Sequence, residues 1–361
     1  MTNFPPGPSA LILAFGLILL PVACDSGSTA PADDLPSDGL SATARIYLNA
    51  ALDIMQASSI NRYQIDWPPL RQAALLQAKG AETTRDTYPA IRSALSALGD
   101  KHSRFYEPQQ VGDVHAPGPI LPTPGPVPPQ AVPPSGQRLE SRVGYVRMPS
   151  FSSMQLTSEE IAAHATSYHS LIRQSDTTGM CGWIVDLRAN HGGNMWPMLA
   201  GIGPILGEGM VGMFVNPDSV KNYWHYEVGK SLNGSYVLVE VGGVPYELID
   251  PDPAVAVLTG PGTASSGEAQ VVAFRGRPNT RSFGEPTYGV PTANAGFHLS
   301  DGALLNLTVA WMADRTGQKY GSPMPPDQLF PGDPTADPAT DPVVLAAEEW
   351  VLQAGACGNG G

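Results

Sequence analysis

Beyond residue 138 the chain alternates between apolar strand patterns and helical patterns, and this alternation restricts the fold more than any other feature. A capping box formed by Thr157 and Glu160 predicts a helix that runs to about Arg173. Further helices are predicted to begin near Asn194 and at Ser265. The predicted strands are Val143–Met148, Trp183–Leu187, Tyr236–Val241, Ala254–Leu258 and Ala303–Ala310. Strands that alternate with helices in this way predict a layered α/β core.

Three helical patterns precede this core and predict a small N-terminal helical domain over residues 41–110. Ser41 is suited to cap the first helix, and apolar residues at helical spacing follow it. Two more patterns lie at Pro69–Lys79 and Thr84–Leu98. A stretch of about seventy residues is enough for a folded unit of this kind.

A segment dense in proline and glycine separates the helical patterns from the α/β core. Proline lacks the amide hydrogen that helices and ladders need, so residues 111–137 are predicted to form an extended linker with no ladder. We therefore place the core at residues 138–345 and a C-terminal tail at residues 346–361.

The amino terminus carries an apolar segment that is typical of an export signal. Ser9–Ala23 is short for a membrane span but suits the core of a signal peptide, which we place at residues 1–24. Cys24 follows in the sequence LPVAC, which resembles a bacterial lipoprotein cleavage site with Cys24 as the lipidated first residue. The alternative is ordinary cleavage near Ala23 and release. Residues 25–40 are rich in Ser, Ala, Pro and Asp and predict a flexible tether.

The charge and the cysteines exclude several classes of function. A formal net charge of -13, without a basic stripe, argues against a nucleic-acid partner. The three scattered cysteines lack metal-site spacing, and no metal or organic cofactor is predicted. If Cys24 is lipidated or removed, Cys181 and Cys357 remain, and they form either a disulfide or two buried thiols.

A serine stands at the opening of a predicted helix in the segment LTGPGTASSGEA, residues 258–269. An apolar strand ends there, small residues turn the chain, and Ser265 lies at the helix start. The unpaired amides and the positive dipole end of a helix favour a developing oxyanion at such a position. The alternative is that Ser265 or Ser266 is a plain N-cap, since N-cap serines are common.

Two other segments contain residue types that suit a catalytic site. In DLRANHGGN, residues 186–194, paired glycines after a strand can direct an amide at a ligand, although a plain strand-to-helix turn gives the same pattern. In LGDKHSRFY, residues 98–106, His102 lies in a turn beside an aspartate and a serine. Among the other histidines, His191 is a reserve candidate because it adjoins the glycine turn.

Five segments, taken in order, resemble the C-terminal processing peptidases, also called tail-specific proteases, of serine peptidase family S41 and their interphotoreceptor retinoid-binding protein-like relatives. The segments are LGDKHSRF, GYVRMPSF, IVDLRANHGG, TASSGE and GEPTYG, followed by the weaker PMPPD. The resemblance implies a crotonase-like fold of ββα units. It also implies that Ser265 is the nucleophile and that the backbone amides of Ser266, Gly192 and Gly193 bind the oxyanion.

The chain departs from the common family pattern at two places. Many members have a lysine base directly after a GEPTFG-like turn, where this chain has Val290, and many have a PDZ domain where this chain has the proline-rich linker. A branch that resembles the nisin-resistance proteases and the tricorn core lacks the lysine and uses a Ser-His pair. That branch implies His102 as the general base. The candidates for orienting its ring are Asp100, Ser103, Glu268 and Glu285.

The resemblance thus implies an exported serine peptidase, periplasmic or at the cell surface, whose only membrane attachment is a lipid at Cys24. Its substrate would be an extended polypeptide, bound in a cleft between the helical domain and the core. Two alternatives remain open. The loss of the lysine suits a binding protein for a peptide or lipophile without turnover, and an esterase would use the same Ser-His pair.

Overall fold

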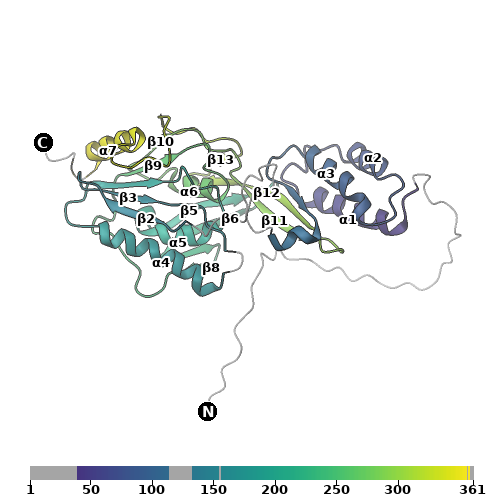
Figure 1. Ribbon diagram of the computed structural model, residues 1–361, viewed down its shortest axis with the longest axis horizontal. Helices are drawn as coiled ribbons and strands as arrows, with labels where there is room; N and C mark the ends of the chain where they lie inside the picture. The colour runs from purple at the N-terminus through teal and green to yellow at the C-terminus, as the bar shows by residue number, and fades with distance from the viewer. Residues whose placement is uncertain (1–38, 114–131, 154–155, 356, 358–361) are drawn as a thin grey trace, which may run out of the picture. The chain divides into compact units, whose positions relative to one another are not determined.

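The computed structural model describes residues 39–113, 132–153, 156–355 and 357. The predicted signal peptide with Cys24, most of the predicted tether and the middle of the predicted linker lie outside the described residues. The part of the chain that is described has a mixed α/β fold in which helices precede the sheets, as predicted (Figure 1). Among these residues, no helix combines the length and the apolar character that crossing a membrane requires.

A six-stranded sheet lies at the centre of the predicted core, in the strand order β14–β10–β9–β4–β3–β2. All neighbouring pairs are parallel except β2 and β3. The central strands β4 and β9 are buried along their whole length, as expected for parallel strands covered on both faces. The strands are β2 (Ser135–Arg138), β3 (Val143–Arg147), β4 (Gly182–Asp186), β9 (Val255–Thr259), β10 (Thr280–Gly284) and β14 (Gln328–Leu329).

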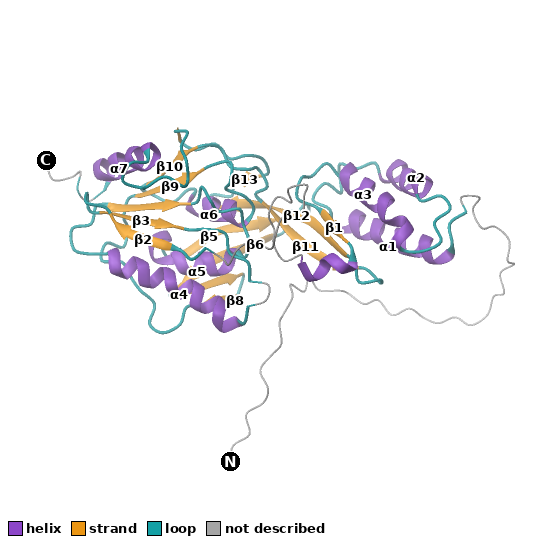
Figure 2. Ribbon diagram, viewed as in Figure 1, coloured by secondary structure: helices purple, strands orange, loops and turns teal. Residues whose placement is uncertain are grey.

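Helices cover both faces of this sheet (Figure 2). Val185 and Val257 face α4, α5 and α6, whereas the alternate residues Ile184 and Ala256 face α7. The helix α7 crosses residue 345, where the sequence analysis ends the core, and its buried side chains belong to the core cluster. The helices are α4 (Ser158–Ser175), α5 (Met195–Leu206), α6 (Ser266–Phe274) and α7 (Pro342–Ala354).

A second sheet has the strand order β1–β12–β5–β6–β7–β8, and β11 and β13 also pair with β12. Three N-terminal helices, α1 (Ala42–Ser58), α2 (Trp67–Gln77) and α3 (Tyr88–Ala97), share a core with Phe105 of β1 and Leu305 of β12. The predicted helical domain therefore ends in a strand of this sheet. The strands are β1 (Arg104–Tyr106), β5 (Gly209–Val215), β6 (Lys221–Glu227), β7 (Lys230–Asn233), β8 (Tyr236–Glu240), β11 (Thr292–His298), β12 (Leu304–Asp314) and β13 (Lys319–Tyr320).

The ladder between β2 and β3 begins inside the segment predicted to be a linker without a ladder. Ser135 pairs with Arg147, and Gly136 pairs with Val146. The last proline of the segment is Pro134, so the residues after it have the amide hydrogens that a ladder needs. The prediction was therefore wrong for the end of this segment.

A disulfide joins Cys181 to Cys357, which are 176 residues apart in sequence and have Cα atoms 5.1 Å apart. The structure thus selects the disulfide over the two buried thiols. Cys181 directly precedes β4, and Cys357 follows α7, so the bond fastens the last helix to the central sheet.

We expect the Cys181→Ser/Cys357→Ser double variant to have a free energy of unfolding about 2–5 kcal/mol below that of the oxidised protein. The physical reason is that the bond closes a long loop and so restricts the unfolded chain. Denaturant titration with and without a reductant measures the difference. Reductant should destabilise the wild type and leave the double variant unchanged, and equal stability of oxidised and reduced wild type would contradict the prediction.

Candidate active site

Ser265 lies in a tight turn between the central strand β9 and the helix α6, and it is 5% exposed. Its φ of 52° and ψ of -114° form a conformation that non-glycine residues rarely adopt and that is found mainly at functional sites. The Ala264 amide donates to the carbonyl of Asn190 over 2.9 Å. The Thr263 hydroxyl donates to the carbonyl of Leu187, also over 2.9 Å. The segment that follows β4 therefore holds the serine turn in place.

The buried carboxylate of Glu268 joins the serine turn to the loop that contains Val290. Its Oε2 accepts from the amides of Ser265 and Val290, each over 2.9 Å. Its Oε1 accepts from the Gly289 amide over 2.9 Å and from the Thr287 hydroxyl over 2.6 Å. Burial raises the pKa of Glu268, and these four donors oppose that shift because they favour the carboxylate. Glu268 therefore fixes the main chain of Ser265 and does not orient a histidine ring.

The chain from residue 102 to residue 106 alternates between two environments. His102, Arg104 and Tyr106 line a cavity, and Tyr106 is itself buried, whereas Ser103 and Phe105 are buried and do not line it. Side chains of extended backbone point alternately to opposite sides, and the antiparallel pairing of β1 with β12 keeps Arg104–Tyr106 extended, while His102 lies in the bend before β1. The bend and the strand together place a histidine, an arginine and a tyrosine in the lining of one cavity.

Asp100 and Asn294 hold the main chain of His102. Asp100 Oδ1 accepts from the His102 amide over 3.0 Å and from the Ser103 amide over 2.6 Å. The hydroxyl of Thr308, on β12, donates to the same oxygen over 2.8 Å, and Asn294 Nδ2 donates to the His102 carbonyl over 3.2 Å. Asp100 and Ser103, two of the four predicted orienting candidates, therefore fix the turn and do not contact the ring.

The imidazole ring of His102 is held by Thr292, the first residue of β11, whose Oγ1 lies 2.9 Å from Nδ1. Its Nε2 has no hydrogen-bond partner among the residues that the structure describes. Burial lowers the pKa of His102 to about 4, the Arg104 guanidinium acts in the same direction, and Asp100 opposes both. In the tautomer that donates Nδ1–H to Thr292, the ring is neutral and Nε2 is a proton acceptor.

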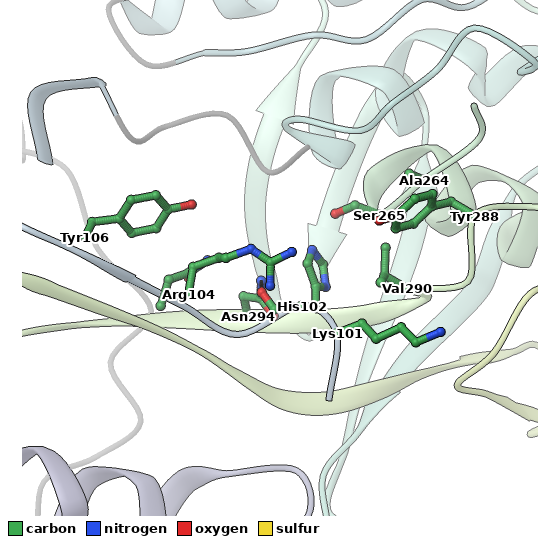
Figure 3. A pocket seen from close by; sticks show the side chains of 10 residues that line it. Lys101, His102, Arg104, Tyr106, Ala264, Ser265, Tyr288, Val290 and Asn294 are labelled. Carbon is green, nitrogen blue, oxygen red and sulfur yellow. Dashed lines mark hydrogen bonds between the residues drawn. The ribbon is translucent and has the colours of Figure 1, made fainter. Parts of the chain in front are cut away.

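His102 and Ser265 line the same cavity, and Figure 3 shows their side chains directed toward one another. Among the described residues, no group of three or more histidine, cysteine or acidic side chains could hold a metal ion. The arrangement places a hydroxyl and a neutral imidazole in the lining of one cavity, and a nucleophile that is activated by a base requires such a pair. The remaining lining residues are Lys101, Arg104, Tyr106, Ala264, Tyr288, Val290, Asn294 and Asn306.

Two of the three predicted oxyanion donors remain available. The Gly192 amide donates to Asn190 Oδ1 over 3.0 Å and is therefore engaged within its own turn. Within the described part of the chain, no acceptor is bound to the amides of Ser266 and Gly193. Ser266 Oγ donates to the Gly193 carbonyl over 2.5 Å, which joins their two segments. A Cβ on Gly193 would lie 1.9 Å from the carbonyl oxygen of Phe151, so only glycine fits there.

Val290, Glu285 and His191, which the sequence analysis singled out, and the two lysines nearest the motifs, Lys101 and Lys319, do not take part in the pairing of serine and histidine. Val290, at the lysine position, is 5% exposed and gives the cavity an apolar wall. Lys101 lines the cavity, but its side chain extends away from Ser265 in Figure 3, and Lys319 lies over a tryptophan ring. Neither Glu285 nor His191 lines the cavity.

Sequence reasoning missed the roles of Thr292, Asn294 and Arg104. Arg104 could have been found, because it is two residues beyond His102 in the same motif. Thr292 and Asn294 carried no local signal, since they meet His102 only through a contact across about 190 residues of sequence.

Comparison with known proteins identifies relatives. A family model described as "Peptidase family S41" matches residues 142–328. The nisin-resistance protein of Lactococcus lactis subsp. lactis is 25% identical over 309 residues, which cover 84% of this chain and 86% of that protein.

Two solved structures are similar in fold. A lipoprotein from Streptococcus agalactiae has a TM-score of 0.67 and 24% identity, over 86% of this chain and 97% of that one. A photosystem II D1 C-terminal processing protease has a TM-score of 0.58 and 18% identity, over 88% of this chain and 99% of that one. Because the family model spans more than half of the chain, the protein belongs to peptidase family S41, a family of serine peptidases.

Proposed function

We propose that this protein is an exported serine peptidase that cleaves polypeptides through an acyl-enzyme, with Ser265 as nucleophile and His102 as general base. The observation that carries the proposal is that these two side chains face one another across one cavity (Figure 3). Family membership supports the peptidase chemistry.

The proton transfers follow from the hydrogen bonds of His102. In the tautomer that donates Nδ1–H to Thr292 Oγ1, Nε2 takes the proton of the Ser265 hydroxyl as that oxygen attacks the scissile carbonyl. The imidazolium then protonates the leaving amine. Water enters, gives a proton to Nε2, and cleaves the acyl-enzyme by the same route. Thr292 is a positioning residue, because it holds the ring and does not touch the substrate.

The negative charge of the tetrahedral intermediate is assigned to the amides of Ser266 and Gly193. Ser266 is the first residue of α6, where the helix dipole also favours an anion. Loss of one such donor typically slows catalysis by about 10²–10³-fold. Glu268 contributes indirectly, since it fixes the unusual main-chain conformation of Ser265.

We expect a fluorophosphonate probe to label the wild type at Ser265 and not to label Ser265→Ala. His102→Ala should label about 10²–10⁴-fold more slowly, because a serine hydroxyl is a weak nucleophile without a base. In-gel fluorescence with intact-mass analysis measures both effects, and hydrolysis of an unstructured peptide should change in parallel. Lys319→Gln, which alters a side chain outside the cavity, serves as the control.

The labelling experiment also separates the alternatives. Folded wild type that never labels would remove the enzyme proposal and favour a binding protein. Labelling together with cleavage of esters and not of peptides would replace the peptidase by an esterase.

We expect the labelling rate to fall to half near pH 4, well below the ordinary histidine value of 6.5. The base is neutral His102, and both burial and the Arg104 cation disfavour its protonated form, so a lower pH is needed to inactivate it. Arg104→Gln removes one of these causes and should move the midpoint upward, though not to 6.5, because burial remains. Circular dichroism at each pH verifies folding. A wild-type midpoint near 6.5, or an unchanged midpoint in Arg104→Gln, would contradict the assignment.

We further propose that the protein is attached to a membrane through lipid on Cys24. The sequence LPVAC supports this, and so does the similarity to a lipoprotein from Streptococcus agalactiae. No other membrane attachment is proposed.

In a bacterial host that processes lipoproteins, we expect an alkyne-bearing fatty acid to label the wild type and not the Cys24→Ser variant. The thiol of Cys24 is the acceptor of the lipid, so its removal should also move the protein from the detergent phase to the aqueous phase. Cys357→Ser is the matched control and should keep the label. Labelling of Cys24→Ser, or an unlabelled wild type, would contradict lipidation.

A further inference from the structure

We infer that Arg104 is a specificity-determining residue that binds a carboxylate of the polypeptide substrate close to the scissile bond. This inference rests on the proposed peptidase function and adds a substrate preference to it.

Arg104 and the proposed base both line the cavity. His102 and Arg104 are two residues apart in sequence, and both line the cavity, His102 from the bend before β1 and Arg104 as the first residue of β1. Figure 3 shows the guanidinium of Arg104 directed toward the His102 ring. Because Ser265, His102 and Arg104 line one cavity, a substrate group that Arg104 binds lies close to the scissile bond.

The charge of Arg104 is not balanced by the part of the protein that the structure describes. Within that part, Arg104 forms no ion pair, and its one hydrogen bond runs from Nη1 to the Ser103 carbonyl over 2.7 Å. A guanidinium has five N–H donors, so most of its capacity is free. The lining residues include two cations and no acidic side chain, although the chain as a whole carries a formal charge of -13. A local positive charge in an acidic protein favours an anionic ligand.

A carboxylate is the anion that polypeptides commonly supply, either on aspartate and glutamate side chains or at the chain end. Its two oxygens match the paired N–H groups of a guanidinium. Lys101 is the other cation of the lining, but its side chain extends away from His102 and Ser265 in Figure 3. The preference is therefore assigned to Arg104.

Binding of a carboxylate at Arg104 also increases the basicity of His102. The Arg104 cation is one of the causes that lower the pKa of His102, along with burial, while Asp100 has the opposite effect. A substrate carboxylate neutralises that cation and so makes Nε2 a stronger base when the acidic substrate is in place. An acidic substrate would gain in turnover as well as in binding.

Three matched pools of decapeptides with otherwise identical composition test the inference. The first carries one aspartate at varied positions and an amidated end, the second carries asparagine instead, and the third carries asparagine and a free carboxyl end. Mass spectrometry measures cleavage of each pool by the wild type, Arg104→Gln, Arg104→Lys, Lys101→Gln and Lys79→Gln. Lys79 is exposed and lies outside the cavity.

We expect the wild type to cleave the first or the third pool at least about tenfold faster than the second, the size of one hydrogen bond to a charged group. Preference for the first pool identifies a side-chain carboxylate, and preference for the third identifies the chain end. Arg104→Gln should lose the preference, Arg104→Lys should restore part of it, and Lys79→Gln should keep it. Equal cleavage of all pools overturns the inference, and so does an equal loss of preference in Lys101→Gln, which would indicate diffuse charge.

Binding to an inactive chain separates this inference from the proposed function. Immobilised Ser265→Ala should retain the preferred pool about tenfold more strongly than the second pool, and Ser265→Ala/Arg104→Gln should not. If the wild type labels with a fluorophosphonate but neither cleavage nor retention depends on a carboxylate, the preference fails while the peptidase stands. If retention depends on Arg104 but no labelling occurs, the carboxylate site stands while the peptidase fails.

Discussion

The carboxylate of Glu268 has no exposed surface, and four donors from two segments of the chain converge on it. One donor is the amide of Ser265, and another is the amide of Val290, so a single side chain sets the spacing between the serine turn and the loop opposite. In the same loop, the Thr292 amide donates to the Val290 carbonyl over 2.8 Å. The hydroxyl of Thr292 is hydrogen-bonded to the ring of His102. Serine and histidine are thus linked through an unbroken series of hydrogen bonds.

The segment that carries His102 is also held in place by the long strand β12. Asp100 and Ser103 bind Thr308 on β12, and β1 continues the pairing toward Leu304. The N-terminal helices pack against the same strand through one apolar cluster. The proposed base, His102, therefore lies in the N-terminal part of the chain, and its position depends on a sheet built mainly by residues far downstream. A change of register in β12 would displace His102 from Ser265.

Several elements of this fold could be predicted from the sequence, because short local residue patterns determine them. The capping box of Thr157 and Glu160 opens α4, and the helix after Ser265 begins within the run of small residues, at Ser266. The family motifs identified the fold and the family. The strands β5, β6, β7 and β11 are among those that were not predicted. In β6 and β11 polar and small residues break the apolar pattern, and these strands form through pairing with distant partners.

The sequence by itself determined the α/β class, the family, the strand-to-helix turn that carries Ser265 and the motif that carries His102, because each is written in a short run of residues. Tertiary structure alone decided which groups meet at the cavity. It assigned Thr292 to the histidine ring, Asp100 and Glu268 to the main chain, and Cys357 to Cys181. Strand register and loop closure determine the pairs whose members are far apart in the sequence. A local residue pattern therefore cannot predict which of these atoms come into contact in the folded chain.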